Sequence, residues 1–202
     1  MSETTPTLPA FERVTWPVRT ARLTIRPVTL EDFARLYEIR SLPGVTHWLT
    51  GSPASLEEYV ERYGTPERLT TTLVSEADDG IVGDLFLALD TPYSQAEVRA
   101  QAERAGGVVG WVVDPTYSGQ GYATEGAAEL LRICFESLGL HRVVAGAFAG
   151  NAASVRVMEK IGMRIESRGV RASLHRDLGW VDHVEAAILA EEWRARNGVD
   201  RP

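Results

Sequence analysis

The sequence predicts an α/β fold: a mixed, mostly antiparallel sheet with helices on both faces and one parallel βαβ crossover. Three observations predict it. Short segments with the alternation or apolar character of strands are interleaved with segments of helical periodicity. The turn Asp78-Asp79-Gly80 joins two such strands as a hairpin. A long amphipathic helix at 124–138 stands between apolar strands at 108–114 and 143–148, which is the pattern of a parallel crossover.

Local signals define the elements of the first half of the chain. Two capping boxes, Thr29–Asp32 and Ser55–Glu58, open two helices. Alternation of polar and apolar residues, or a run of apolar ones, marks the strands. The expected elements are, in order, a strand at 22–26, a helix at 33–40, a helix at 55–63, and strands at 70–77 and 81–89.

The second half begins with a polar stretch at 92–107, rich in Ala, Glu and Arg, which predicts a short helical excursion or a mobile flap. Gly139 and Gly162 end the two helices that follow. The expected elements are a strand at 108–114, a helix at 124–138, a strand at 141–148, a helix at 154–161, and closing strands at 163–170 and 181–189 joined by a loop at 171–180.

Size and composition predict one domain. The chain has 202 residues, 44% of them hydrophobic, and no repeat, low-complexity tract or linker divides it. We expect a flexible N-terminal arm at 1–20, a single domain at 21–194 and a C-terminal tail at 195–202. The formal charge of −7 does not favour nucleic acid as a partner and is compatible with a cationic acceptor such as an amine.

We expect neither a signal peptide nor a membrane-spanning segment within this sequence. Residues Met1–Pro17 lack a basic start followed by an apolar core, and the longest apolar run, 85–89, is too short to span a bilayer. The single cysteine, Cys134, lies among apolar residues at helical spacing and predicts a buried structural thiol. We therefore expect a cytoplasmic protein without a membrane partner.

A turn with two glycines, Ser118-Gly119-Gln120-Gly121-Tyr122-Ala123-Thr124, separates the strand at 108–114 from the helix at 124–138. Glycine permits positive φ and close approach of the backbone. A strand, a glycine turn and a helix in series point several backbone N–H groups at one spot, at the positive end of a helix dipole. The turn therefore predicts an anion site, and a ligand that carries phosphate.

Three phosphate-binding patterns compete with a plain strand-to-helix turn. A P-loop needs a lysine after its second glycine, and none follows Gly121. A dinucleotide fingerprint needs a third glycine where Thr124 stands, which argues against NAD. The acyl-CoA pattern, Gln/Arg-x-x-Gly-x-Gly/Ala, matches 118–123 through Gly121 and Ala123, but Ser118 replaces the expected Gln or Arg.

Several motifs in series resemble the GNAT superfamily of acetyl-CoA-dependent N-acetyltransferases. They look most like the branch that acetylates the N-termini of ribosomal proteins, with its antibiotic- and small-amine-acetylating relatives. The resemblance covers roughly residues 20–194, and Ser118 and the insertion at 92–107 depart from the family pattern. The matching segments are Arg22–Pro27, Glu31-Asp32, Trp48-Leu49, Gly110–Pro115, Gly119–Glu125, Asn151–Ser154, Met158–Met163, Asp182-His183 and Glu192-Trp193.

The resemblance implies direct transfer of an acetyl group from acetyl-CoA to a primary amine, on a protein N-terminus or a small molecule. It implies that the backbone of Trp111, Val112 and Val113 hydrogen-bonds the pantetheine arm. The loop from Ser118 to Thr124 then holds the pyrophosphate, chiefly through backbone N–H groups. A backbone N–H near Val112 and Val113 is the expected donor to the oxyanion.

Further side chains have both a functional and a structural interpretation. Asn151 is expected to hydrogen-bond the cofactor or to cap a helix, and Ser154 to protonate the leaving thiolate or to bond locally. Glu125 is a candidate general base or a complement to the helix dipole. Asp84, Asp182 and His183 are other candidate bases, and the acidic residues Glu57, Glu58 and Glu61 border the acceptor site or form a surface helix face.

Alternative functions stay open at this point. A non-catalytic acyl-CoA-binding module is one, because no base is evident, and acetylation of an antibiotic or a polyamine-type amine is another. The four histidines and one cysteine show no metal-ligand spacing, so no metal is expected. Relatives in this branch are often dimers, and a homodimer is expected by that analogy alone.

Overall fold

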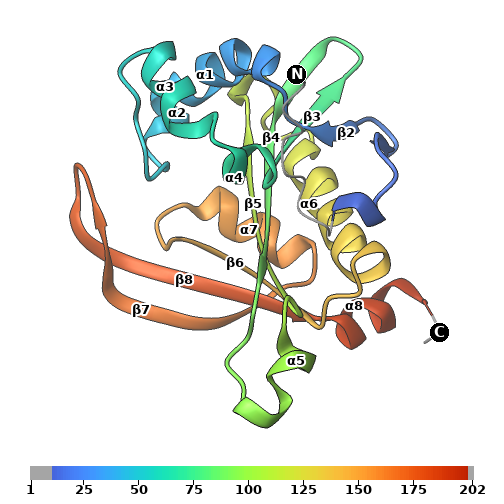
Figure 1. The fold of residues 1–202 in the computed structure, drawn as a ribbon. Coiled ribbons are helices and arrows are strands. Elements are labelled where there is room, and N and C mark those ends of the chain that lie inside the picture. The colour runs from blue at the N-terminus through green and yellow to red at the C-terminus, as the bar shows by residue number, and fades with distance from the viewer. Residues whose placement is uncertain (1–10, 200–202) are drawn as a thin grey trace. The chain divides into compact units, whose positions relative to one another are not determined.

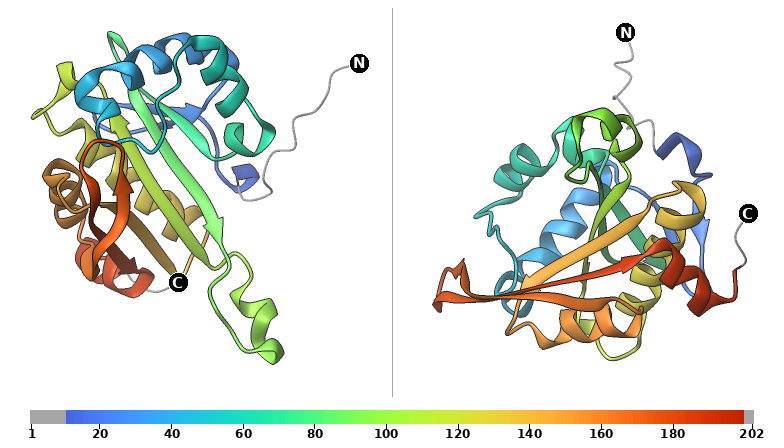
Figure 2. Two further views of the ribbon diagram at one scale, coloured as in Figure 1. Left: turned by 90° about the vertical axis from the view of Figure 1, so that its left-hand side faces the viewer. Right: turned by 90° about the horizontal axis from the view of Figure 1, so that it is seen from below.

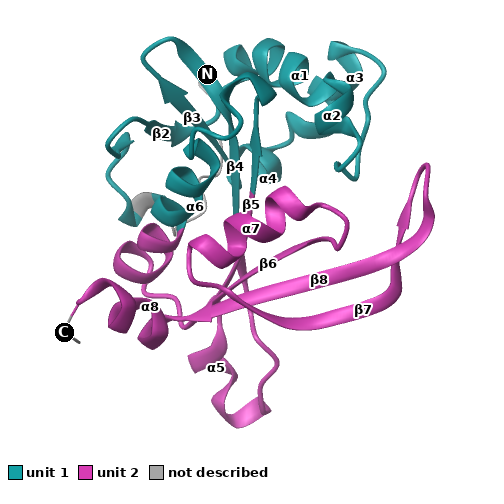
Figure 3. Cartoon of the chain, turned by 180° about the vertical axis from the view of Figure 1, so that it is seen from behind, with its two compact units in different colours: residues 1–87, 111–130 teal, residues 88–110, 131–202 magenta. Residues whose placement is uncertain are grey.

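The computed structural model describes residues 11–199, and their ribbon is drawn in Figure 1. The chain forms two compact units (Figure 3). The described residues of unit 1 are 11–87 and 111–130, and those of unit 2 are 88–110 and 131–199. Hydrogen-bonded strands follow the order β1-β2-β3-β4-β5-β6-β8-β7 in a sheet of eight strands. The predicted fold class, mixed α/β and mostly antiparallel, is confirmed.

Unit 1 holds the N-terminal elements and the start of the long helix. They are η1 (Phe11–Arg13), β1 (Val18–Arg19), β2 (Thr24–Pro27), η2 (Leu30–Asp32), α1 (Phe33–Ser41), α2 (Pro43–Thr46), α3 (Leu56–Tyr63), α4 (Pro66–Leu69), β3 (Thr72–Ala77), η4 (Pro115–Tyr117) and most of α6 (Tyr122–Arg132). Strands β4 (Gly80–Asp90) and β5 (Gly106–Val113) each run from one unit into the other.

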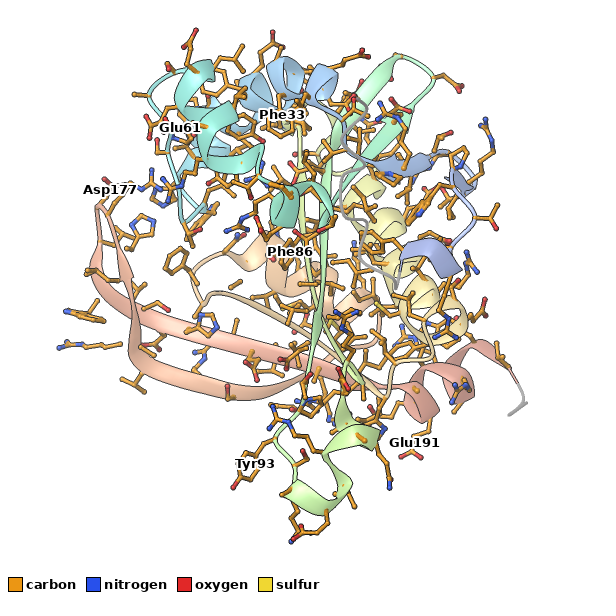
Figure 4. The ribbon with its side chains drawn as sticks, viewed as in Figure 1. Phe33, Glu61, Phe86, Tyr93, Asp177 and Glu191 are labelled. Atoms are coloured by element: carbon orange, nitrogen blue, oxygen red, sulfur yellow. The ribbon has the colours of Figure 1, made fainter. Side chains whose placement is uncertain are left out.

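The antiparallel strands β1 to β3 and the first part of β4 carry the core of unit 1. Adjacent strands pair antiparallel from β1 to β4. One buried cluster of Val28, Phe33, Leu36, Tyr59 and Val74 joins helices α1 and α3 to strand β3. Figure 4 labels Phe33, which is 3% exposed. The capping box predicted at Thr29–Asp32 is confirmed. At Ser55 the predicted N-cap is confirmed, since its hydroxyl accepts from the Glu58 N–H, but the reciprocal bond of a capping box is replaced by one from the Ala54 N–H to the Glu58 carboxylate.

Unit 2 contains the rest of the chain. Its elements are η3 (Ala96–Val98), α5 (Arg99–Ala102), the π-helical turn η5 (Ile133–Ser137), β6 (Arg142–Phe148), α7 (Ala152–Lys160), β7 (Arg164–His175), β8 (Gly179–Leu189) and α8 (Ala190–Asn197). Strand β6 pairs parallel with the start of β5 and antiparallel with β8, which pairs antiparallel with β7. The parallel crossover predicted from the sequence is therefore confirmed.

The closing strands are longer than the sequence predicts. The loop predicted at 171–180 is wrong, because β7 and β8 pair as far as His175 and Gly179 and only Arg176–Leu178 turn between them. The two strands form one long ribbon (Figure 2). The register shifts between Gly169 and Ser173, and this bulge breaks the alternation by which a strand is recognised.

The insertion at 92–107 contains the short helical excursion that its composition predicts, formed by η3 and α5. Tyr93 lies in it and is fully exposed (Figure 4).

The arm predicted at 1–20 is only partly within the described residues. Its described part, 11–20, contains η1 and β1, and Phe11, Val14 and Val18 are each buried. The tail predicted at 195–202 begins inside α8, which ends at Asn197. Within residues 11–199, no helix combines the length and apolar character that crossing a membrane requires.

Candidate active site

The glycine turn lies between η4 and α6, in unit 1. Its start is fixed by Asp114, a buried carboxylate that accepts from the Thr116 N–H at 2.9 Å and pairs with Arg35 at 2.5 Å. Partial burial raises the pKa of Asp114, and the bonds from Thr116 and Arg35 outweigh this and lower it below its ordinary value. Asp114 is therefore an ionised anchor for the chain that leads into the turn.

Two residues of the turn have the left-handed backbone that glycine permits. Gly119 has φ of 76° and Gly121 has φ of 87°. The first helical hydrogen bond of α6 runs from the Glu125 N–H to the Gly121 carbonyl. The N–H groups of the first turn, including those of Tyr122, Ala123 and Thr124, precede that bond and have no partner within the helix. The local geometry is that of an anion-binding helix N-terminus.

The carboxylate of Glu125 is held by residues that precede strand β2. Its Oε1 accepts from the Thr20 hydroxyl at 2.6 Å and from the Arg22 N–H at 2.8 Å, and its Oε2 accepts from Arg22 Nε at 2.7 Å. Partial burial raises the pKa of Glu125, but these hydrogen bonds outweigh it and lower the pKa. This geometry favours a structural role for the side chain.

The end of β5 forms the part of unit 1 that the resemblance assigns to the pantetheine arm. Trp111, Val112 and Val113 are half-buried, and a Cβ added at Gly83 would lie 2.0 Å from the Val112 carbonyl oxygen. Glycine at position 83 is thus required for the close approach of the two backbones. Among the described residues, the Trp111 indole Nε1 is a buried side-chain donor with no hydrogen-bond partner.

Asn151 and Ser154 lie together at the start of α7, in unit 2. The Asn151 Oδ1 accepts from the Ser154 backbone N–H at 3.2 Å, which confirms the predicted helix cap. The Asn151 amide keeps its NH₂ group for another partner, because the cap uses only the oxygen. Both side chains are half-buried. Arg156 and Lys160, further along the helix, are exposed.

The remaining candidate bases already accept or share hydrogen bonds. Asp84 is held by Arg40 through two bonds of 2.8 and 2.6 Å. The Asp182 Oδ1 accepts from the Arg171 N–H at 3.0 Å. His183 Nδ1 lies 3.3 Å from the Ser173 hydroxyl.

On α3, the acidic residues proposed to border the acceptor site are exposed, and Glu58 also accepts from the Ala54 N–H at 2.8 Å. Figure 4 labels Glu61 on this helix.

The site residues thus form two groups. Trp111–Val113, the turn at 118–124 and Glu125 belong to unit 1, and Asn151 and Ser154 belong to unit 2. Sequence reasoning missed Arg22, whose guanidinium lies against the turn: Nη1 donates to the Gln120 carbonyl at 2.8 Å. The sequence signal that could have pointed to Arg22 is Ser118, because this short side chain replaces the Gln or Arg of the acyl-CoA pattern and leaves room for a polar side chain from elsewhere in the chain.

A family model described as "Acetyltransferase (GNAT) domain" matches residues 22–164. The chain belongs to the GNAT family and is an N-acetyltransferase. The resemblance found in the sequence is therefore confirmed, and acetyl-CoA is the acetyl donor of this family.

Three relatives illustrate the similarity. The "Uncharacterized N-acetyltransferase YnaD" of Bacillus subtilis is 28% identical over 179 residues, which cover 87% of this chain and 98% of that protein. The "Putative ribosomal N-acetyltransferase YdaF" of the same species is 27% identical and covers 85% of this chain and 93% of its own. The solved structure of Mycobacterium smegmatis RimJ in complex with CoA-disulfide has a TM-score of 0.68 at 25% identity, and covers 87% of this chain and 89% of its own.

Proposed function

We propose that this acetyltransferase acts on an α-amino group, that of a peptide N-terminus or of a small molecule. The observation that carries the proposal is that the candidate carboxylate bases Glu125, Asp84 and Asp182 all accept hydrogen bonds within the protein. An α-amino group has a pKa of about 7.7–8.0 and is largely neutral near pH 8, whereas a lysine, near about 10.4, needs a strong base. An acceptor that needs little help fits these three candidate bases, because each already accepts a hydrogen bond within the protein.

In the proposed reaction the diphosphate of acetyl-CoA binds the N–H groups of the turn at 118–124, and the pantetheine arm follows the backbone of Trp111–Val113. The family resemblance also assigns the amide of Asn151 to cofactor binding. The neutral amine attacks the thioester carbonyl, a C–N bond forms, and the carbonyl oxygen takes the charge. The C–S bond then breaks as the oxyanion collapses, and Ser154 Oγ gives its proton to the departing thiolate. The attacking nitrogen loses one proton to solvent, and Ser154 Oγ takes one proton back from solvent, so the protons balance.

The first experiment is calorimetric titration of the protein with acetyl-CoA and with CoA. We expect saturable binding at sub-millimolar concentrations, as supported by the CoA complex of a relative. Absence of binding in that range would reject the proposal that the turn at 118–124 binds the diphosphate of acetyl-CoA.

The second experiment measures thiol release with three kinds of acceptor: peptides with a free N-terminus, the same peptides blocked at the N-terminus but carrying lysine, and a polyamine. We expect release with the first set, and a rate that rises with pH as the α-amine loses its proton. Release only with the polyamine or with lysine would reject the α-amine proposal and leave the acetyltransferase assignment intact.

The role of Ser154 is tested separately. Because the helix cap uses the backbone N–H of Ser154 and not its hydroxyl, Ser154→Ala leaves the cap in place. We expect kcat to fall by about 10²-fold, as is usual for loss of one general acid, with the Kd of acetyl-CoA unchanged. Ser167→Ala, on the exposed part of β7, is the matched control. Equal kcat in all three proteins would assign Ser154 a local structural role only.

A further inference from the structure

Arg22 binds two parts of the turn region at once, although it precedes β2 in the sequence. Its Nε and Nη2 lie 2.7 and 2.6 Å from Glu125 Oε2, and its Nη1 donates to the Gln120 carbonyl at 2.8 Å. The guanidinium also lies 4.4 Å from the centre of the Tyr122 ring. All four residues belong to unit 1. One side chain therefore fixes the last residues of the turn and the first turn of α6.

Glu125 creates an electrostatic problem for a diphosphate site. It lies in the first turn of α6, the same turn whose N–H groups are proposed to receive the phosphates. Its side chain is 17% exposed, so water screens its charge only weakly. A carboxylate there stabilises the free helix through the dipole but repels a bound anion. Without a counter-charge, the helix N-terminus would lose much of its attraction for phosphate.

Arg22 supplies that counter-charge in a fixed geometry. Its planar guanidinium carries a positive charge and faces the Glu125 carboxylate. The Arg22 side chain is 43% exposed, and each of its three guanidinium nitrogens contacts Glu125 or the Gln120 carbonyl. Ser118 has a short neutral side chain at the position where the acyl-CoA pattern has Gln or Arg, so position 118 supplies no long polar side chain.

We propose that Arg22 is a positioning residue of the coenzyme site, which neutralises Glu125 and holds the Gln120 carbonyl so that the turn can accept the diphosphate. This inference rests on the proposed use of the turn for acetyl-CoA. Arg22 acts through Glu125 and the loop backbone. Removing Glu125 should therefore make Arg22 less necessary.

The test measures the Kd of CoA by calorimetry for the wild type, Arg22→Ala, Glu125→Gln and the double variant. We expect Arg22→Ala to raise Kd at least about tenfold, because it leaves a carboxylate unpaired beside the diphosphate. Glu125→Gln should change Kd by less, and the double variant should recover most of the lost affinity. Arg19→Ala, an exposed arginine that contacts Thr24, is the matched control and should bind like the wild type.

A second readout separates a local effect from poor folding. S-acetylpantetheine lacks the diphosphate, so Arg22→Ala should keep the wild-type kcat/KM with this truncated donor while its KM for acetyl-CoA rises. If Arg22→Ala is too unstable to purify, Arg22→Lys serves instead, because it keeps the charge but lacks the planar guanidinium. We expect it to raise the Kd of CoA and the KM for acetyl-CoA by a smaller factor than Arg22→Ala.

Three results would overturn the inference: unchanged CoA affinity in Arg22→Ala, a double variant as weak as Arg22→Ala, or equal loss with the truncated donor. Failure of the wild type to bind CoA would instead reject the proposed function, and is distinguishable because it affects every variant alike.

Discussion

Arg40 on α1 holds the carboxylate of Asp84 on β4 through a two-pronged ion pair within unit 1. The Asp84 side chain is 2% exposed and that of Arg40 is 20% exposed, and the two bonds measure 2.8 and 2.6 Å. Both carboxylate oxygens are thus occupied by one guanidinium. Asp84, a candidate base in the sequence, therefore anchors helix α1 to strand β4.

Asp84→Asn should destabilise the protein strongly. Removing one partner of a buried pair leaves the other charge buried without compensation, and typically costs about 3–5 kcal/mol. We expect a loss of that size in the free energy of unfolding measured by urea titration. The double variant Arg40→Met/Asp84→Leu should lose less than Asp84→Asn alone. A loss below about 1 kcal/mol for Asp84→Asn, as for the exposed control Arg68→Ala, would show that the pair contributes little.

Gly121 of the turn gives a second prediction, with Gly139 as the control. Gly121 has φ of 87° and Gly139 has φ of 70°, and neither would place a Cβ closer than 3.4 Å to another group. Alanine at either position should therefore lower stability by a similar amount, about 1–2 kcal/mol from the left-handed backbone alone. Only Gly121→Ala should also raise the KM for acetyl-CoA. The same KM in both variants would contradict a ligand at the turn.

Stability at low pH should depend on Glu166. The hydrogen bond from Arg142 is the largest effect on the Glu166 carboxylate and lowers its pKa. Partial burial raises the pKa and pairing with Arg164 lowers it, and the net result is a pKa of about 2. An unfolded glutamate titrates near about 4.3, so between these pH values the unfolded chain binds more protons and stability falls as pH falls. The contribution is complete above about pH 4.5 and is lost toward pH 2.

The measurement compares the wild type with Glu166→Gln by urea unfolding between pH 7 and pH 2.5. The stability difference between them should be largest at neutral pH and shrink across the acid range. Glu103→Gln, in the exposed insertion, is the matched control for the loss of one carboxylate. A difference that stays constant with pH would contradict the shifted pKa.

Cys134 should be inert to thiol reagents in the folded protein. The side chain is 0% exposed, and burial raises the pKa of its thiol, so the reactive thiolate is not formed near neutral pH. We expect no labelling in native buffer and stoichiometric labelling in denaturant. Fast labelling of the native protein would show that this part of unit 2 opens readily.

Much of the fold could be predicted from local signals. The capping box at Thr29–Asp32, the N-cap at Ser55 and the turn before Gly80 depend on residues close in sequence, and the structure contains all three. The β7–β8 ribbon was mispredicted because its bulge breaks the alternating pattern. The short helices α2, α4 and α8 were missed, since four- to eight-residue helices are stabilised by packing rather than by their own propensity.

For the site, the sequence by itself determined the glycine turn and the Asn151–Ser154 pair, because backbone conformation at glycine and a helix cap are decided within a few residues. Only the tertiary structure decided which carboxylates are occupied. Glu125 meets Arg22 across 103 residues of sequence, and Asp84 meets Arg40 across 44. Charge pairing acts through space, so the chain must fold before the partner of a carboxylate is defined.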